Sequence, residues 1–302
     1  TLGAGGTVGV GAVALSTVER PELEIVDGGG IVAGIGVRAD DVVIRDLGMY
    51  GFDYNVDVQN FARAVITGTV QGATAAGADP GGAARTLNQS IRARDGDSGQ
   101  ILNNYFAYNS RAGISLQTTA HGWPIENNEF RFNDQEANVN GADGISVDQS
   151  ANTTIRGNLV TQNRGAGIHF WQSGGGNTIV NNTITSNSTA SGGGVVADRF
   201  GIGLDTSGAG NVVDRNIVSG NQNGSDGIRV NSTNGIVIIG NYVGTDAAGT
   251  AALGNAGSGI YLNASATATI GGTTVPERNL ISGNAIGRSE ERRVGKECRS
   301  RW

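Results

Sequence analysis

Hydrophobic and polar positions alternate over short stretches of this chain, and the alternation recurs with an asparagine at a fixed place. The shared frame is I-x-x-N-x-[apolar]-x-x-N. It occurs as ILNNYFAYN (101–109), IENNEFRFN (125–133), IRGNLVTQN (155–163), IVNNTITSN (179–187), VDRNIVSGN (213–221) and IIGNYVGTD (238–246). A seventh copy, RNLISGN (278–284), has Pro276 where the frame expects its leading aliphatic residue. Short alternating segments bounded by glycine, asparagine and serine predict β-strands rather than helices.

A second element, with the frame G-I-x-[L/V/F], accompanies these copies. It reads AGISL (112–116), DGISV (143–147), AGIHF (166–170), FGIGL (200–204), DGIRV (226–230) and SGIYL (258–262). The distance from this element to the next leading Ile or Val is nearly constant, whereas the gap before the element varies widely. We therefore expect insertions at only one corner of each repeating unit.

The repeating unit of about 23 to 26 residues is too short for a strand-helix-strand unit and is typical of a solenoid. Successive coils of a β-solenoid stack at about 4.8 Å, so equivalent positions form columns along its axis. Two buried aliphatic columns are predicted. They consist of Ile101, Ile125, Ile155, Ile179, Val213 and Ile238, and of Ile114, Ile145, Ile168, Ile202, Ile228 and Ile260.

One asparagine per coil falls among these aliphatic residues, where an isolated amide would be costly to bury. Stacked amides can bond to one another and to the bent backbone at a corner, so we expect them to form a ladder. The predicted rungs are Asn104, Asn128, Asn158, Asn182, Asn216, Asn241 and Asn279.

The residue between the two apolar positions of G-I-x-[L/V/F] points away from the core by the period of two, so we expect it in solvent. Two neighbouring outward columns result. The first is Ser115, Ser146, His169, Gly203, Arg229 and Tyr261, and the second is Gln117, Asp148, Trp171, Asp205, Asn231 and Asn263. Gly203 has no side chain, so we expect a gap between its two neighbours, and the insertions 134–143 and 188–200 are expected to wall this face.

Catalytic and ligand-binding candidates follow from these two columns. Asp148 and Asp205 lie two coils apart, about 9 to 10 Å, close to the ~6.5 to 9.5 Å that separates acid and base in an inverting glycosidase. His169 is a group that titrates near neutrality, and Arg229 suits a uronate carboxylate. Trp171 offers a flat stacking surface. The interpretation that competes with catalysis is an outward face that binds glycans or is merely solvated. The candidates are therefore Asp148, His169, Asp205 and Arg229 as catalytic residues, and Trp171, Asn231 and Tyr261 as ligand-binding residues.

The whole pattern resembles the repeats of the right-handed, single-stranded parallel β-helix in the pectin-lyase-like family, most strongly over residues 99–287. The resemblance implies an all-β fold. NYVGTDAAGTAALGNAGSGIYL and IGGTTVPERNLISGN are especially similar to repeats of large secreted or surface-attached bacterial β-helix proteins. Residues 1–98 read as less regular coils with a loop at about 73–84. The chain starts at Thr1, and we expect it to be a fragment truncated at both ends.

The signatures of enzymes in this family are mostly missing. The paired aspartates and Gly-His-Gly of polygalacturonase-like members are absent, as is the calcium-plus-arginine arrangement of pectate lyases. YGFDYNVD (50–57) is similar to the YGFDPHD of alginate epimerases, but it lacks the proline and histidine. DGDSG (95–99) begins like a calcium loop, so calcium at Asp95 and Asp97 stays open although no metal or cofactor is otherwise expected. His121 reads as a loop residue.

Charge and composition limit the classes of partner that the chain is expected to bind. The last stretch, RSEERRVGKECRSRW (288–302), resembles a translated sequencing adapter, so we treat it as an artefactual tail. It contains the only Lys and the only Cys, and without it the net charge of −6 becomes about −9. An acidic body without lysine argues against nucleic-acid binding. The absence of any run of 18 apolar residues argues against a membrane span.

Together these observations predict an extracellular or cell-surface repeat domain that presents a face to polysaccharides, cell-surface glycans or proteins, in the manner of an adhesin. The alternative is a polysaccharide lyase or glycoside hydrolase acting on an acidic polysaccharide.

Overall fold

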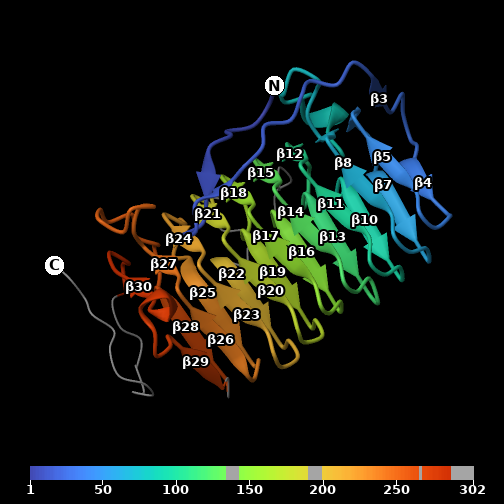
Figure 1. Cartoon of the computed structure of the whole chain (residues 1–302). Coiled ribbons are helices and arrows are strands. Elements are labelled where there is room, and N and C mark those ends of the chain that lie inside the picture. Colours follow the sequence, from blue (N-terminus) through green and yellow to red (C-terminus); the bar gives the residue numbers. More distant parts are fainter. Residues whose placement is uncertain (134–142, 190–198, 265–266, 287–302) are drawn as a thin grey trace.

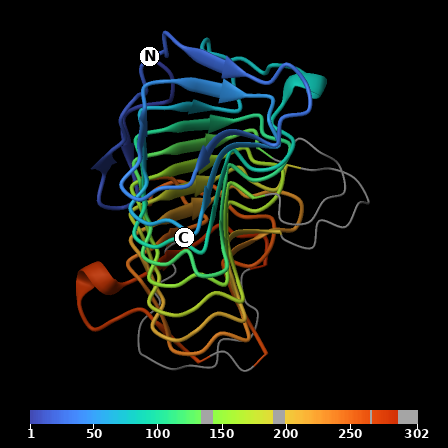
Figure 2. The same ribbon diagram turned by 90° about the vertical axis from the view of Figure 1, so that its right-hand side faces the viewer.

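The computed structural model describes residues 1–133, 143–189, 199–264 and 267–286, so the tail 288–302 and most of the two long insertions lie outside the described residues. Short strands stack coil upon coil into a rod (Figure 1). Viewed from its side, the rod shows successive coils lying one above another (Figure 2). Three parallel sheets of nine, nine and ten strands run along its length, which confirms the parallel β-helix.

Each full coil gives one strand to each sheet. Sheet 1 contains β4 (Ala33–Val37), β7 (Tyr54–Gln59), β10 (Ile91–Arg94), β13 (Ile114–Gln117), β16 (Ile145–Asp148), β19 (Ile168–Trp171), β22 (Phe200–Asp205), β25 (Asp226–Asn231) and β28 (Ile260–Asn263). Sheet 2 contains β5 (Val43–Arg45), β8 (Val65–Thr67), β11 (Gln100–Leu102), β14 (Pro124–Glu126), β17 (Thr154–Arg156), β20 (Thr178–Val180), β23 (Val212–Asp214), β26 (Ile236–Ile239) and β29 (Ala268–Ile270).

Sheet 3 contains β3 (Glu24–Val26), β6 (Gly48–Tyr50), β9 (Val70–Gln71), β12 (Tyr105–Ala107), β15 (Glu129–Arg131), β18 (Leu159–Thr161), β21 (Thr183–Thr185), β24 (Ile217–Ser219), β27 (Tyr242–Val243) and β30 (Leu280–Ile281). Two short 3-10 turns, η1 (Gly82–Ala84) and η2 (Val275–Glu277), lie in connecting loops. Strands on both sides of residue 98 belong to the same three sheets.

The aliphatic columns lie in the predicted register. Ile155 pairs with Ile125 on one side and Ile179 on the other, and Ile168 lies between Ile145 and Ile202 in the same way. All of these side chains are buried. Period-two alternation is enough to fix this register, because a slip of one residue would turn every aliphatic side chain outward.

The asparagines form a continuous ladder at the corner between sheets 2 and 3, and all of them are buried except the last, Asn279, which is half-buried. In each rung the Nδ2 donates to the Oδ1 of the next asparagine, at distances of 2.9 to 3.1 Å. The same Nδ2 also donates to a backbone carbonyl of the preceding coil, as Asn182 does to Ile155 (2.9 Å). Every amide is therefore satisfied along the stack, which removes the cost of its burial.

A second ladder follows sheet 3, and sequence analysis did not predict it. It joins Asn109, Asn133, Asn163, Asn187, Asn221, Asn255 and Asn284 by the same amide-to-amide bonds. The sixth rung is Asn255, although the repeat frame places Asp246 there. Asp246 instead accepts backbone N–H groups from Thr250 and Ala251 within its own corner loop.

The expectation that insertions enter at one corner only was wrong. Ile270 is in register with Ile238, so it takes the leading position that the frame gave to Pro276. The extra residues lie between β29 and β30 and include η2. Another insertion lies between β27 and Asn255. The spacing of the repeats alone does not show at which corner of a coil an insertion lies, because the loops and the adjacent strands both contain small polar residues.

An N-terminal hairpin runs along the outside of sheet 3, and we call residues 1–18 the N-terminal strap (Figure 1). Its strands β1 (Thr7–Val8) and β2 (Val13–Ala14) pair antiparallel. The Gly9 N–H donates to Thr183 Oγ1 (3.0 Å) and the Val10 N–H donates to the Arg215 carbonyl (2.8 Å). The strap thus contacts coils that are far from it in the sequence.

Candidate functional site

The outer face of sheet 1 carries the two polar columns in the predicted register. His169 lies between Ser146 and Gly203, and Arg229 pairs with Gly203 and Tyr261. In the neighbouring column, Trp171 lies between Asp148 and Asp205, followed by Asn231 and Asn263. The strand pairing therefore brings the candidate residues onto one surface.

The expectation that this first column lies in solvent was wrong for its first three members. Ser115, Ser146 and His169 are buried, and in the second column Asp205 is only 1% exposed. Phe200 covers His169, because its ring packs edge-to-face on the imidazole with 5.0 Å between centroids. The gap expected at Gly203 is filled by the same ring, because a Cβ there would lie 2.1 Å from the Phe200 Cε2.

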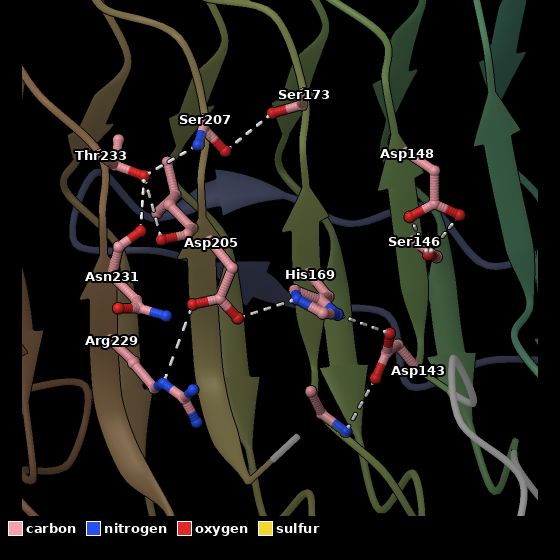
Figure 3. A network of polar contacts seen from close by, with 12 residues as sticks. Asp143, Ser146, Asp148, His169, Ser173, Asp205, Ser207, Arg229, Asn231 and Thr233 are labelled. Atoms are coloured by element: carbon pink, nitrogen blue, oxygen red, sulfur yellow. Dashed lines mark hydrogen bonds and ion pairs between the residues drawn. The ribbon is translucent and has the colours of Figure 1, made fainter. Parts of the chain in front are cut away.

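A chain of charged groups crosses four strands of this face (Figure 3). His169 Nδ1 lies 3.4 Å from Asp143 Oδ2, and His169 Nε2 lies 3.2 Å from Asp205 Oδ2. On the far side, Arg229 Nε is 3.9 Å from Asp205 Oδ1. Two carboxylates therefore flank the two ring nitrogens of His169, and Arg229 lies on the other side of Asp205.

Asp143 completes this chain of charges, and sequence analysis did not name it as a site residue. It is buried, and its Oδ1 accepts the Ala166 N–H at 3.1 Å. The signal was the Asp that directly precedes Gly-Ile in DGISV and again, as Asp226, in DGIRV. That Asp lies two residues before the inward Ile and three before the outward position, so the period of two alone does not place it on the outer face.

Asp226 occupies a different environment from Asp205. It is in register with Phe200, and its Oδ1 accepts the Ser258 N–H at 2.8 Å. Burial raises the pKa of the Asp226 carboxyl above its ordinary value, although the hydrogen bonds from Ser258 oppose this effect. Asp226 therefore takes up a proton more readily than an exposed aspartate does.

Trp171 is the large aromatic side chain that this face exposes, at 44% of its surface. Its ring meets the His169 ring edge-to-face, with 6.0 Å between centroids. Asp148 lies on the adjacent strand toward the N-terminus and is close to the Ser146 hydroxyl, 3.3 Å from Oδ1 (Figure 3). Asp148 and Asp205 are separated by the strand of Trp171, so the two carboxylates are not in contact.

The two remaining ligand-binding candidates lie toward the C-terminal end of the same face. Asn231 accepts a hydrogen bond from the Asn263 amide (3.3 Å), and Tyr261 is in register with Arg229. Both are half-buried. They extend the polar surface beyond Arg229 rather than closing a pocket around it.

Asp95 and Asp97, the open calcium candidates, accept hydrogen bonds from the corresponding loop of the next coil. Asp95 Oδ1 accepts the Thr118 hydroxyl at 2.7 Å, which lowers the pKa of this exposed carboxyl. Asp97 accepts the His121 N–H, and His121 Nδ1 accepts the Ala151 N–H, both at 2.9 Å. Within the described ranges, no group of three or more His, Cys, Asp or Glu side chains is arranged to hold a metal ion.

A family model described as "Right handed beta helix region" matches residues 67–184 and 95–289, which together make up more than half of the chain. The chain belongs to this family of right-handed parallel β-helices. Among curated proteins, none matches the chain. Of the described segments, none is a helix with the length and apolarity to span a bilayer.

Several solved structures share the fold. The periplasmic alginate epimerase AlgG is 15% identical with a TM-score of 0.54, covering 75% of this chain and 50% of its own. The Dettilon tailspike protein is 19% identical with a TM-score of 0.57, over 81% and 45%. Pectate lyase Pel9A is 15% identical with a TM-score of 0.51, over 90% and 67%. This chain therefore spans about half the length of AlgG, and such identities establish the fold alone.

Proposed function

We propose that this chain is a polysaccharide-binding β-helix domain that works outside the cell or on its surface, and that the outer face of sheet 1 is its binding face. The observation that carries the proposal is Trp171, an exposed ring in the middle of a polar face. The fold is shared with an enzyme named for alginate, an enzyme named for pectate and a tailspike, and this supports the choice of a carbohydrate ligand.

The geometry around Trp171 suits a sugar ring. Its contact with His169 fixes the orientation of the indole, which lowers the entropy lost on binding. Asp148 and Asn231 supply hydrogen-bond acceptors and donors on either side, as sugar hydroxyls require. A flat face built from parallel strands extends along the rod, so it suits an extended polymer better than a small ligand.

Replacing Trp171 tests this proposal. We expect Trp171→Ala to weaken binding at least about tenfold, or about 1.4 kcal/mol, in a glycan array followed by calorimetry on the best ligand. Leu253→Ala is the matched control, since Leu253 is as exposed (46%) but lies on the corner loop after β27. Equal affinity of Trp171→Ala and the wild type for that ligand would contradict the proposal.

The second candidate function is a polysaccharide lyase or glycoside hydrolase. The chain of charges from Asp143 through His169 and Asp205 to Arg229 favours it, because coupled acids and bases beside an aromatic platform are what such chemistry requires. Asp148 and Asp205, on opposite sides of Trp171, are the proposed acid and base pair.

Turnover distinguishes the two functions. Reducing-sugar and unsaturated-uronate assays on the bound polymer detect hydrolysis and elimination respectively. For an enzyme, Asp205→Asn and His169→Gln would abolish product formation, while the Leu253→Ala control retains it. If the wild type binds the polymer tightly but forms no product in either assay, the binding function is supported and the catalytic function is excluded.

A further inference from the structure

The N-terminal half of the sheet 1 face carries a second charged cluster, which sequence analysis did not single out. Arg92 and Arg94 are on β10, Tyr54 and Asp57 are on β7, and Arg38 directly follows β4. We call these five residues the arginine cluster. Asp57 and Arg92 are in register on adjacent strands, in the column that continues to Ser115 and His169.

The cluster is held rigidly. Asp57 is buried and accepts Arg38 Nη2 at 2.7 Å and Arg92 Nε at 2.8 Å. The Arg92 guanidinium also lies over the Tyr54 ring, 3.6 Å from its centroid. Burial opposes ionisation of Asp57, but the bonds from the two arginines prevail and lower the pKa of its carboxyl. Both guanidiniums are therefore fixed beside a permanent anion at neutral pH.

One carboxylate cannot balance three guanidiniums, so the cluster presents excess positive charge. Arg94 has no ion pair among the described residues, and its Nε is buried without a hydrogen-bond partner there. Among carboxylates on the adjoining turns, Asp40 and Asp41 bind Arg63, and Asp95 accepts the Thr118 hydroxyl and interacts with Arg94 only as a nearby charge, without an ion pair. The Arg94 guanidinium, on the same face as the paired Arg38 and Arg92, is therefore able to bind an anionic group of a ligand.

The C-terminal half of the same face has the opposite character. Four carboxylates lie near His169 and Arg229 there: Asp143 and Asp205 are buried, and Asp148 and Asp226 are half-buried. A carboxylate-bearing sugar over Trp171 would meet the Asp148 carboxylate on the adjacent strand, whereas a neutral sugar would not be repelled by it. Arg94 and Trp171 are three strand spacings apart, about 14 Å, so one extended polymer reaches both.

We propose that the ligand is a heteropolysaccharide with alternating acidic and neutral sugars, bound with an acidic unit on the arginine cluster and a neutral unit on Trp171. This inference rests on the proposed function, because it specifies the polymer that the same face binds. It predicts that neither a polymer of uronates alone nor a neutral polymer is the best ligand.

Three probes test it with the intact protein: hyaluronan oligosaccharides, which alternate acidic and neutral units, polygalacturonate oligosaccharides of the same length, and neutral β-glucan oligosaccharides. We expect the alternating probe to bind about tenfold tighter than the neutral one at low salt. The advantage should shrink as salt rises, because it is electrostatic. If polygalacturonate binds as tightly as hyaluronan, the neutral subsite at Trp171 is contradicted. If β-glucan binds as tightly as hyaluronan, the acidic subsite at the arginine cluster is contradicted.

Variants separate this inference from the proposed function. Arg94→Gln and Arg38→Gln should each remove most of the preference for hyaluronan over β-glucan, and Asp57 keeps Arg92 in both. Arg156→Gln is the control, because Arg156 is exposed, pairs with Glu126 and lies on sheet 2. An unchanged preference in Arg94→Gln and Arg38→Gln defeats the acidic subsite alone. Arginine-dependent binding that survives Trp171→Ala defeats the proposed Trp171 site alone, and no binding of any probe defeats both.

Discussion

At the scale of single residues, a buried asparagine is stable in this protein because its amide has partners in both directions along the stack. Asn182 donates to Asn216 Oδ1 (3.0 Å) and to the Ile155 carbonyl, and its Oδ1 accepts both the Nδ2 and the backbone N–H of Asn158. A hydrophobic residue of similar size would leave these partners without bonds. The amide at this position is therefore needed to satisfy the hydrogen bonds of the neighbouring coils.

Replacing Asn182 by alanine should lower the free energy of unfolding by about 1 to 3 kcal/mol, because buried donors and acceptors lose their partners. Denaturant unfolding followed by circular dichroism measures the change. Asn263→Ala is the control, since Asn263 is exposed at the end of sheet 1. Identical unfolding curves for Asn182→Ala and the wild type would show that the ladder does not stabilise the fold.

Asp226 should make stability depend on pH in the direction opposite to a typical ion-paired aspartate. Its folded-state pKa is raised above the ordinary 3.8 by burial, so its contribution falls as pH rises through that raised value. Asp226→Asn should therefore melt a few degrees higher than the wild type at pH 7. Calorimetry below about pH 3 should show the two proteins alike, because both then carry a neutral group. A lower melting temperature of the variant at pH 7 would refute this.

At the scale of elements, the strands and their register could be predicted from the sequence because both follow from local periodicity. Ile155 and Ile168 are buried in the columns to which the repeat frame assigned them. The burial of His169 could not be predicted in this way. It depends on the Phe200 ring, which lies on the next strand and folds across Gly203, and the repeat frame contains no information on side-chain direction along the face.

The arginine cluster escaped prediction for a related reason. Arg38, Asp57 and Arg92 lie far apart in the sequence, in coils whose frame is irregular, and only the strand pairing places them together. Likewise, Pro276 was assigned to a strand position that Ile270 occupies. The alternation within the two flanking strands does not reveal how many loop residues lie between them.

The hairpin of the N-terminal strap approaches the coils most closely at Gly9. A Cβ at Gly9 would lie 2.4 Å from the Asn181 backbone, so Gly9→Ala should lift the hairpin and leave the coils folded. Leu2 and Val18 at the ends of the strap stay packed against Val70 and Tyr105. Gly6→Ala is the control, since Gly6 shares the left-handed backbone (φ +85°) but has open space around it. Limited proteolysis should cleave residues 1–18 faster in Gly9→Ala than in Gly6→Ala, and equal rates would contradict the assigned contact.

At the scale of the whole molecule, each coil contacts mainly its two neighbours, so stability is distributed along a line rather than around one centre. Coils in the middle of the stack have neighbours on both sides. The strands β28, β29 and β30 are the last in their sheets, and Ile260, Ile270 and Ile281 on them are only half-buried. Cooperative unfolding is therefore expected to start at the end of the rod.

Hydrogen exchange measured by mass spectrometry should reveal this gradient. Amides of β17 to β20 should exchange slowest, and those of β28 to β30 should exchange faster by orders of magnitude, because local opening at an end breaks fewer contacts. The peptide containing Ile155 serves as the internal reference, since its side chain is fully buried. Uniform protection along the chain would indicate one cooperative unit instead.

The asparagine ladders keep the spacing between successive coils constant, whatever the number of residues in each coil. Asn104 and Asn128 are 24 residues apart, Asn241 and Asn279 are 38 apart, and in both pairs the amides meet at 3.0 Å. Whole peptides can thus be added or removed at the corners while the pitch stays constant. Such a scaffold accepts new surface loops, by evolution or by grafting, without any change to the frame that displays them.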